Sequence, residues 1–193
     1  MARIPALPVL MACLAALTPA GAVAAQEDGF SGLERQLRSR FFNIYLKEGV
    51  DADRLAMRIA VPPSTRAMVY SSTSSFGSDH LEDQLDRLFL VVTEILEARM
   101  KQFESSVKVC ESASGLGEVS ERLFGREIKA GGFYVVALDS LYIDSENVTL
   151  YVLGHEMAHA VISKYFVVPP PERIQEVLAG YVEYELRKQT RSL

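Results

Sequence analysis

The region around two histidines, His155 and His159, constrains the fold of this chain more than any other feature. Because they are four residues apart, a helix would place their side chains one above the other, within reach of a single metal ion. The three prolines at 169–171 force an extended break after that helix, since proline disfavours helix in the residue before it. Proline also suits the first position of a following helix. The sequence therefore predicts two consecutive helices, over about 146–166 and 171–189.

The residue after the first histidine adds chemistry to this pattern. Glu156 is placed to act as a general base that takes a proton from a zinc-bound water. A structural zinc site needs no such base, so the five residues His155 to His159 predict a catalytic Zn²⁺ centre.

Two histidines leave a catalytic zinc one protein ligand short. No histidine follows His159, and no aspartate follows Asp144, so a downstream ligand must be a glutamate. Glu176 is favoured, because the small residues at 179–180 reduce the bulk of the helix face that carries it. Glu183 shares this face two turns later and is the main rival; the other glutamates of this region are Glu172 and Glu185.

These motifs resemble those of the gluzincin metallopeptidases, in particular the small thermolysin-like modules called minigluzincins or peptidase MA-like proteins. The resemblance is carried by residues 154–161, GHEMAHAV, and 174–181, IQEVLAGY, and covers roughly residues 107–188. It implies that His155, His159 and Glu176 bind the zinc. The aspartate found in thermolysin four residues after the ligand glutamate is absent, because Gly180 stands there.

The resemblance implies a zinc-dependent peptidase in which Glu156 moves the proton to the leaving amine. It also implies that an edge strand before the zinc helix pairs with an extended peptide or protein substrate. Residues 133–138 are the candidate strand, in a hairpin with 141–143 that turns at 139–140. Three residues are candidates for stabilising the oxyanion, and the sequence does not choose among them: His80, Tyr165 and Tyr181.

Two alternative interpretations assign the chain to other classes of protein. Peptide deformylases carry the same histidine pair with an upstream cysteine as third ligand, and Cys110 lies upstream here, although its neighbours do not match that family. The second alternative is a catalytically inactive zinc- or peptide-binding module of the cell envelope.

The first residues predict export. Residues 1–25 have a basic start, an apolar run and small residues before a polar stretch, which is the pattern of a cleaved signal peptide. A secreted or periplasmic location follows, and removal of the signal leaves no stretch apolar enough for a stable membrane span. The remaining chain keeps one cysteine, Cys110, so no internal disulfide supports it. The net charge of −5 is spread along the chain, without a basic run that would indicate nucleic acid.

The other elements complete an α+β prediction. Residues 26–78 are predicted as a separate segment with an amphipathic helix over 30–49, a strand over 55–61 and a Ser/Gly-rich connector at 71–78. This segment could cover the cleft or pack as a support. Residues 79–193 are predicted as a compact zincin-like catalytic domain with a small mixed or antiparallel sheet, an active-site helix and a C-terminal helix bearing Glu176. It would begin with a long helix from Leu81 to Met100, followed by a strand at 107–111 and a short helix at 117–124. The sequence gives no indication of oligomeric state.

Overall fold

The computed structural model describes residues 28–62, 80–100 and 102–190. The predicted signal peptide at 1–25 and the predicted connector at 71–78 lie outside these residues. The described elements are β1 (Arg35–Arg38), β2 (Phe42–Leu46), α1 (Ala52–Arg58), α3 (Leu81–Ile95), β3 (Ser105–Cys110), α4 (Ala113–Phe124), β4 (Gly132–Val135), a 3-10 turn (Val136–Leu138), β5 (Ser140–Asp144), α5 (Leu150–Tyr165) and α6 (Glu172–Thr190).

The strands form one mixed sheet in the order β1-β2-β3-β5-β4. The three central strands run parallel, with Ile44 opposite Val107 and Val107 opposite Leu141. Both outer strands run antiparallel to their neighbours, and β4 has only β5 beside it among the described strands. The predicted α+β class with a small mixed sheet is confirmed.

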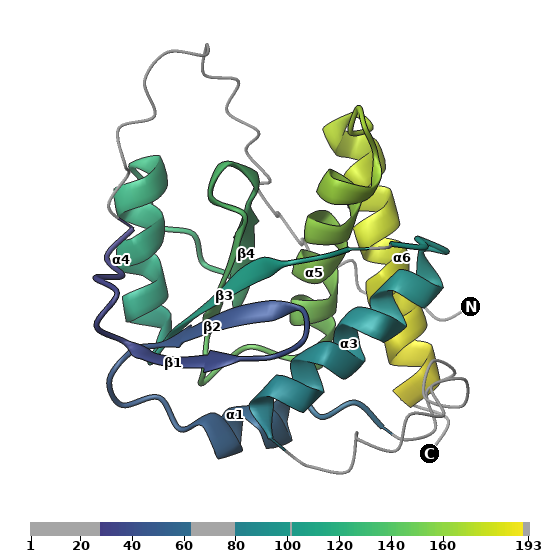
Figure 1. Ribbon diagram of the computed structural model, residues 1–193. Coiled ribbons are helices and arrows are strands. Elements are labelled where there is room, and N and C mark those ends of the chain that lie inside the picture. Colours follow the sequence, from purple (N-terminus) through teal and green to yellow (C-terminus); the bar gives the residue numbers. More distant parts are fainter. Residues whose placement is uncertain (1–27, 63–79, 101, 191–193) are drawn as a thin grey trace, which may run out of the picture.

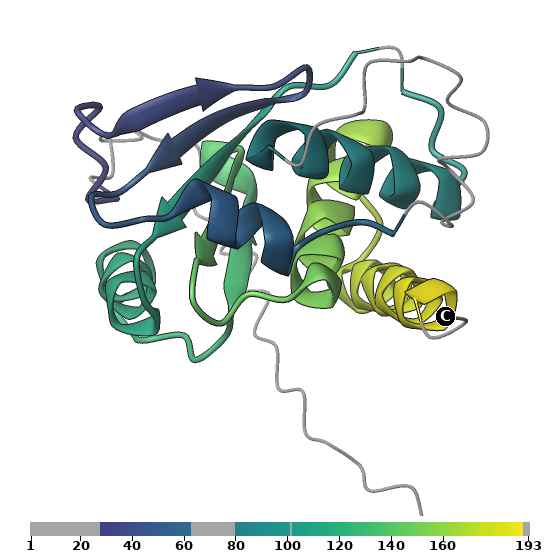
Figure 2. The ribbon, with the colours of Figure 1, turned by 90° about the horizontal axis from the view of Figure 1, so that it is seen from below.

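Helices cover both faces of this sheet (Figures 1 and 2). On one face, α1, α3 and α5 bury the larger apolar cluster, which includes Ile44, Val107 and Ile143. On the other face, α4 covers a smaller cluster that contains Cys110 and Tyr142. Alternate residues of β5 thus enter different clusters, as strand geometry requires. Helix α6 packs along the side of α5 that is away from the centre of the sheet (Figure 2).

The predicted helix over 30–49 is wrong, because most of this region forms the hairpin of β1 and β2. Phe42, Ile44 and Leu46 alternate with half-buried residues and are almost fully buried, which is the period of a strand. A residue far along the chain stabilises the turn: the Asp86 carboxylate of α3 accepts hydrogen bonds from the amides of residues 40 and 41 at 3.0 and 3.3 Å. Tertiary contacts of this kind override the helical spacing of the apolar residues.

The predicted strand over 55–61 is also wrong, since α1 occupies most of it. Asp51 caps this helix by accepting from the amides of Asp53 and Arg54. Leu55 and Ile59 are buried, and their spacing of four residues is that of a helix face.

The remaining predicted elements are confirmed with changes at their ends. The long helix after residue 79 ends at Ile95, and the strand, the short helix and the hairpin before the histidine pair are all present. The first strand of the hairpin ends at Val135 rather than at the predicted residue 138, because Val136–Leu138 form a 3-10 turn. The helix bearing the histidines begins later than expected. Asp144 accepts a hydrogen bond from the Glu146 amide in a turn before the helix, and Thr149 caps α5 by accepting from the Val152 amide at 3.2 Å.

The first described residue, Asp28, is tied to the sheet by a buried polar cluster. Its carboxylate pairs with the Lys108 ammonium of β3 and accepts from the Tyr142 hydroxyl of β5 at 2.6 Å. The Phe30 amide donates to the same carboxylate at 3.0 Å, and the Phe30 ring packs edge-on against Tyr142. This cluster fixes the start of the fold on the face covered by α4.

Gly154 allows α5 and α6 to approach closely. A Cβ atom at this position would lie 2.3 Å from Leu186 Cδ1, and Leu186 is fully buried. Gly180 was expected to serve this purpose, but a Cβ there would meet nothing within 4 Å. Ala179 does face the core and is fully buried. The close approach therefore depends on the glycine next to the first histidine.

Within the described part of the chain, no helix is long and apolar enough to cross a membrane.

We expect Gly154→Val to lower the free energy of unfolding by about 1–3 kcal/mol, because the new methyl groups overpack a site that Leu186 fills. The same change at Gly180 is the matched control and should cost nothing, since valine has a slightly better helix propensity than glycine and the site is open. Urea unfolding followed by circular dichroism measures both. Equal effects at the two positions would contradict the packing role of Gly154.

Burial alone would raise the pKa of Asp28, but the hydrogen bonds from Lys108, Tyr142 and Phe30 outweigh it and hold that pKa below its usual value. Such a group contributes stability above its unfolded-state pKa and loses it as the pH falls through the folded-state pKa. We therefore expect Asp28→Asn to cost about 1–3 kcal/mol at pH 5 to 8, and the difference from wild type to shrink below about pH 4. Urea titrations across this pH range, with the exposed Glu121→Gln as control, measure the effect.

Candidate metal centre

Three side chains converge where α5 and α6 pack together. The Nε2 atoms of His155 and His159 lie 3.5 and 3.3 Å from the two carboxylate oxygens of Glu176. One ligand atom from each residue lies within 4.8 Å of the others, and this is the single group of such ligands found among the described residues. These are the three ligands predicted from the sequence, and the helical break at the prolines brings the third one back to the first two.

The secondary structure explains this convergence. One helical turn separates the histidines on α5, so both rings point to the same side. Glu176 comes one turn after α6 begins at Glu172, where Pro171 accepts the first amide bonds of the new helix. Both histidine side chains are buried, and Glu176 keeps about 29% of its side-chain surface exposed. The histidine side of the site is therefore buried, and the Glu176 side is accessible to solvent.

The donor chemistry fits a zinc ion. Burial lowers the pKa of His155, and the neighbouring His159 lowers it further, while Glu176 and Glu183 oppose the shift. A neutral imidazole is the form that binds a metal. Neither ring nitrogen of His155 makes a hydrogen bond within the described part of the chain, although both are buried. A buried polar atom left in this state is costly, and a metal ligand bond would satisfy it.

Glu156 lies beside this group and is almost completely buried. Its Oε2 accepts a hydrogen bond from the Tyr134 amide of β4 at 3.0 Å. Its Oε1 is also buried and makes no hydrogen bond within the described residues. Burial raises the pKa of Glu156 to about 7, with the nearby acidic side chains adding to the shift and His159 and the Tyr134 amide opposing it. A carboxyl group with a pKa near neutrality can both accept and release a proton.

Glu183 has a place that was not expected from the sequence. It was the rival third ligand, but its Oε2 lies 3.6 Å from Nδ1 of His155, on the far side of the ring from Glu176. It therefore approaches the nitrogen that a zinc ion at Nε2 would leave free. The spacing of two turns from Glu176 indicated that Glu183 would lie near the histidines. Only the position of α6 in the structure shows that it approaches Nδ1 of His155.

The other candidate residues lie elsewhere. Cys110 is buried in the cluster beneath α4 and is not part of the ligand group, and burial raises the pKa of its thiol to about 12. His80 precedes α3 and is exposed, and Tyr165 packs edge-on against Phe166. The structure gives none of these a contact with the histidine pair.

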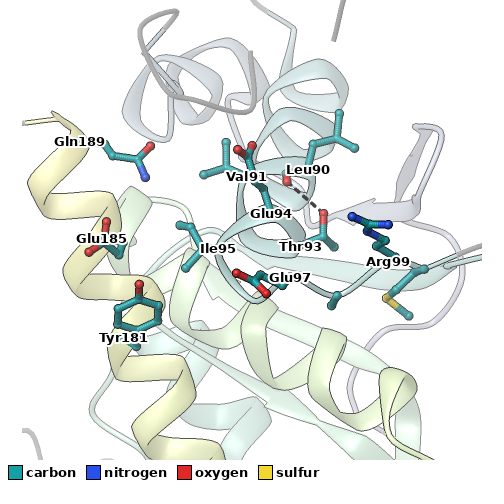
Figure 3. Close-up of a pocket in the computed structure, with 12 residues that line it drawn as sticks. Leu90, Val91, Thr93, Glu94, Ile95, Glu97, Arg99, Tyr181, Glu185 and Gln189 are labelled. Atoms are coloured by element: carbon teal, nitrogen blue, oxygen red, sulfur yellow. Dashed lines mark hydrogen bonds between the residues drawn. The ribbon is translucent and has the colours of Figure 1, made fainter. Parts of the chain in front are cut away.

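Tyr181 points into a different cavity (Figure 3). This cavity, of about 920 Å³, lies between the end of α3 and one face of α6, and it is lined by residues such as Ile95, Glu97 and Glu185. None of the three candidate ligands lines it. This cavity is therefore separate from the candidate ligand group.

Comparison of the chain with models of protein families, with curated proteins and with solved structures found no match.

We expect the purified protein to bind one zinc ion, and Glu176→Ala to weaken binding by more than about 100-fold, because outer-shell changes alone cost 10- to 100-fold. Cys110→Ala is the control and should leave zinc affinity unchanged. Metal analysis and competition with a chromogenic chelator measure both. Loss of zinc from the Cys110 variant would contradict this assignment.

Proposed function

We propose that this protein is an exported, zinc-dependent peptidase of the gluzincin type. The observation that carries the proposal is the convergence of His155, His159 and Glu176 beside a buried Glu156, one of whose carboxylate oxygens makes no hydrogen bond with the described residues. A purely structural site has no use for this fourth group. The signal-like residues 1–25 support export, and Asp28 anchors the fold shortly after them.

The three ligands would hold the zinc ion, which acts as a Lewis acid toward water and the substrate carbonyl. Glu156 is the general base in this proposal: Oε1 receives the proton of the attacking water, and the same group then delivers a proton to the departing amine. Its hydrogen bond to Tyr134 fixes Oε2 and leaves Oε1 for this transfer. The raised pKa of Glu156 suits a group that must gain and lose a proton in one cycle.

The substrate would lie along β4. This strand is at the edge of the described sheet and faces no other described strand on its outer side, so an extended peptide could add to it. The amide of Tyr134 already donates a hydrogen bond to Glu156. Main-chain hydrogen bonds to a substrate would therefore use the other backbone N–H and C=O groups on the outer edge of β4. Pairing there would place a scissile bond beside the general base, because Tyr134 joins strand and base directly.

The second candidate function is a catalytically inactive zinc- or peptide-binding module. The same ligand geometry would bind zinc in such a module, and the open edge of β4 would bind peptide. The two proposals differ in whether Glu156 moves a proton.

We expect the zinc-loaded wild type to cleave members of a broad peptide library, and Glu156→Gln to lower kcat/KM by about 10²- to 10⁴-fold, the usual contribution of a general base. Glutamine preserves the size of the side chain, so the variant should bind zinc as the wild type does. The exposed Glu121→Gln is the matched control for preparation and folding. A wild-type protein that binds zinc and peptides but cleaves none would favour the binding module.

A further inference from the structure

Two carboxylates from one helix hold the His155 ring between them. Glu176 Oε2 lies 3.5 Å from Nε2, and Glu183 Oε2 lies 3.6 Å from Nδ1. Two turns of an α-helix take 7.2 residues, so these glutamates, seven apart, share one face of α6. The imidazole itself is almost completely buried, and solvent therefore does not compete for either nitrogen.

We propose that Glu183 is a positioning residue that accepts the Nδ1–H of His155 and so directs the Nε2 lone pair toward the zinc ion. This inference rests on the proposed zinc site. A metal-binding histidine needs its other nitrogen protonated and oriented, and a carboxylate partner also makes the ring a stronger ligand. At 3.6 Å the two atoms are just outside hydrogen-bond range, and closing the contact requires an approach of roughly 0.5 Å.

Arg187 holds the Glu183 carboxylate in this orientation. Its Nε and Nη2 atoms donate to Oε1 of Glu183 at 3.1 and 2.7 Å. That oxygen is therefore occupied, and Oε2 is the one directed at His155. The guanidinium in turn lies 4.2 Å above the ring of Tyr151, which is on α5 one turn before His155. The orientation of Glu183 is thus fixed from both helices.

This arrangement explains how the site can form with glycine at position 180. An aspartate there would start from a Cβ that faces open space, since no atom lies within 4 Å of that point. Position 183 returns to the face of Glu176 and is close to the buried ring. The longer spacing from the ligand glutamate therefore fits the path of α6 in this chain.

The test compares zinc affinity among single variants of the full mature chain. We expect Glu183→Ala to raise the zinc dissociation constant 10- to 100-fold, as loss of an outer-shell carboxylate does. Glu185→Gln is the matched control two residues further along α6, where the carboxylate pairs with Lys188 instead, and it should stay within twofold of wild type. Chelator competition measures the constants, and circular dichroism of the metal-free proteins verifies folding.

A second measurement separates positioning from a structural role. Long-range ¹H–¹⁵N spectra of the zinc-loaded protein should show a slowly exchanging Nδ1–H on His155 in wild type, and this signal should be lost in Glu183→Ala. If the alanine variant does not fold, Glu183→Gln replaces it, and removal of the charge should weaken zinc binding about 10-fold, the lower end of the range for outer-shell changes.

The possible failures are distinguishable. A wild-type protein that binds no zinc would overturn both the proposed function and this inference. A wild type that binds one zinc ion, together with a folded Glu183 variant whose affinity stays within twofold and whose Nδ1–H signal persists, would overturn this inference alone.

Discussion

The close contact between α5 and α6 is the constraint on which the candidate site depends. Gly154 leaves room for the Leu186 side chain, and Leu186 comes one turn after Glu183 on α6. Each residue of a helix turns the side-chain direction by about 100°. A slip of α6 by one residue against Gly154 would therefore turn both glutamates away from the histidines. An apolar contact with no metal-binding group of its own thus sets the register of the candidate metal ligands.

Without a bound cation, the buried ionisable groups of the site destabilise the folded state. Glu156 is buried near Glu176 and Glu183, and both of these raise its pKa beyond the effect of burial. Burial disfavours the charged form of His155, and the neighbouring His159 disfavours it further. Clustering groups in this way costs free energy, and a fold selected for stability alone would place apolar side chains here. A divalent cation reverses the balance, because it becomes the largest local charge and stabilises the carboxylates around it. The cluster is therefore better explained by a function than by packing.

Local patterns in the sequence were sufficient for most of the second half of the fold. The histidine spacing, the prolines at 169–171 and the scarcity of other ligands predicted α5, α6 and the three converging side chains. The predictions for the segment before residue 62 were wrong because the contacts that select its secondary structure join residues far apart in the chain. Residues 30–45 have apolar side chains at both helical and alternating positions, and the pairing of β2 with β3 and the Asp86 contact select the strand. The second role of Glu183 was hidden for the same reason, since the sequence shows which face it shares but not which atom it meets.

The link between β4 and α5 gives the candidate substrate strand a fixed position relative to Glu156. Tyr134 joins β4 to α5 at two points: its amide donates to Glu156, and its hydroxyl contacts Ser163 Oγ at 3.1 Å. Those two partners lie on either side of His159, about two helical turns apart. The same hydroxyl donates to Asp139 at the turn that ends the hairpin, at 3.0 Å. Because the amide and the hydroxyl of Tyr134 both bond to α5, β4 cannot slide along that helix without breaking one buried and one part-buried hydrogen bond. Under the proposed function, a peptide paired with β4 would therefore be aligned with the general base by the backbone of the strand itself. No movement of a lid would be needed to bring the two together.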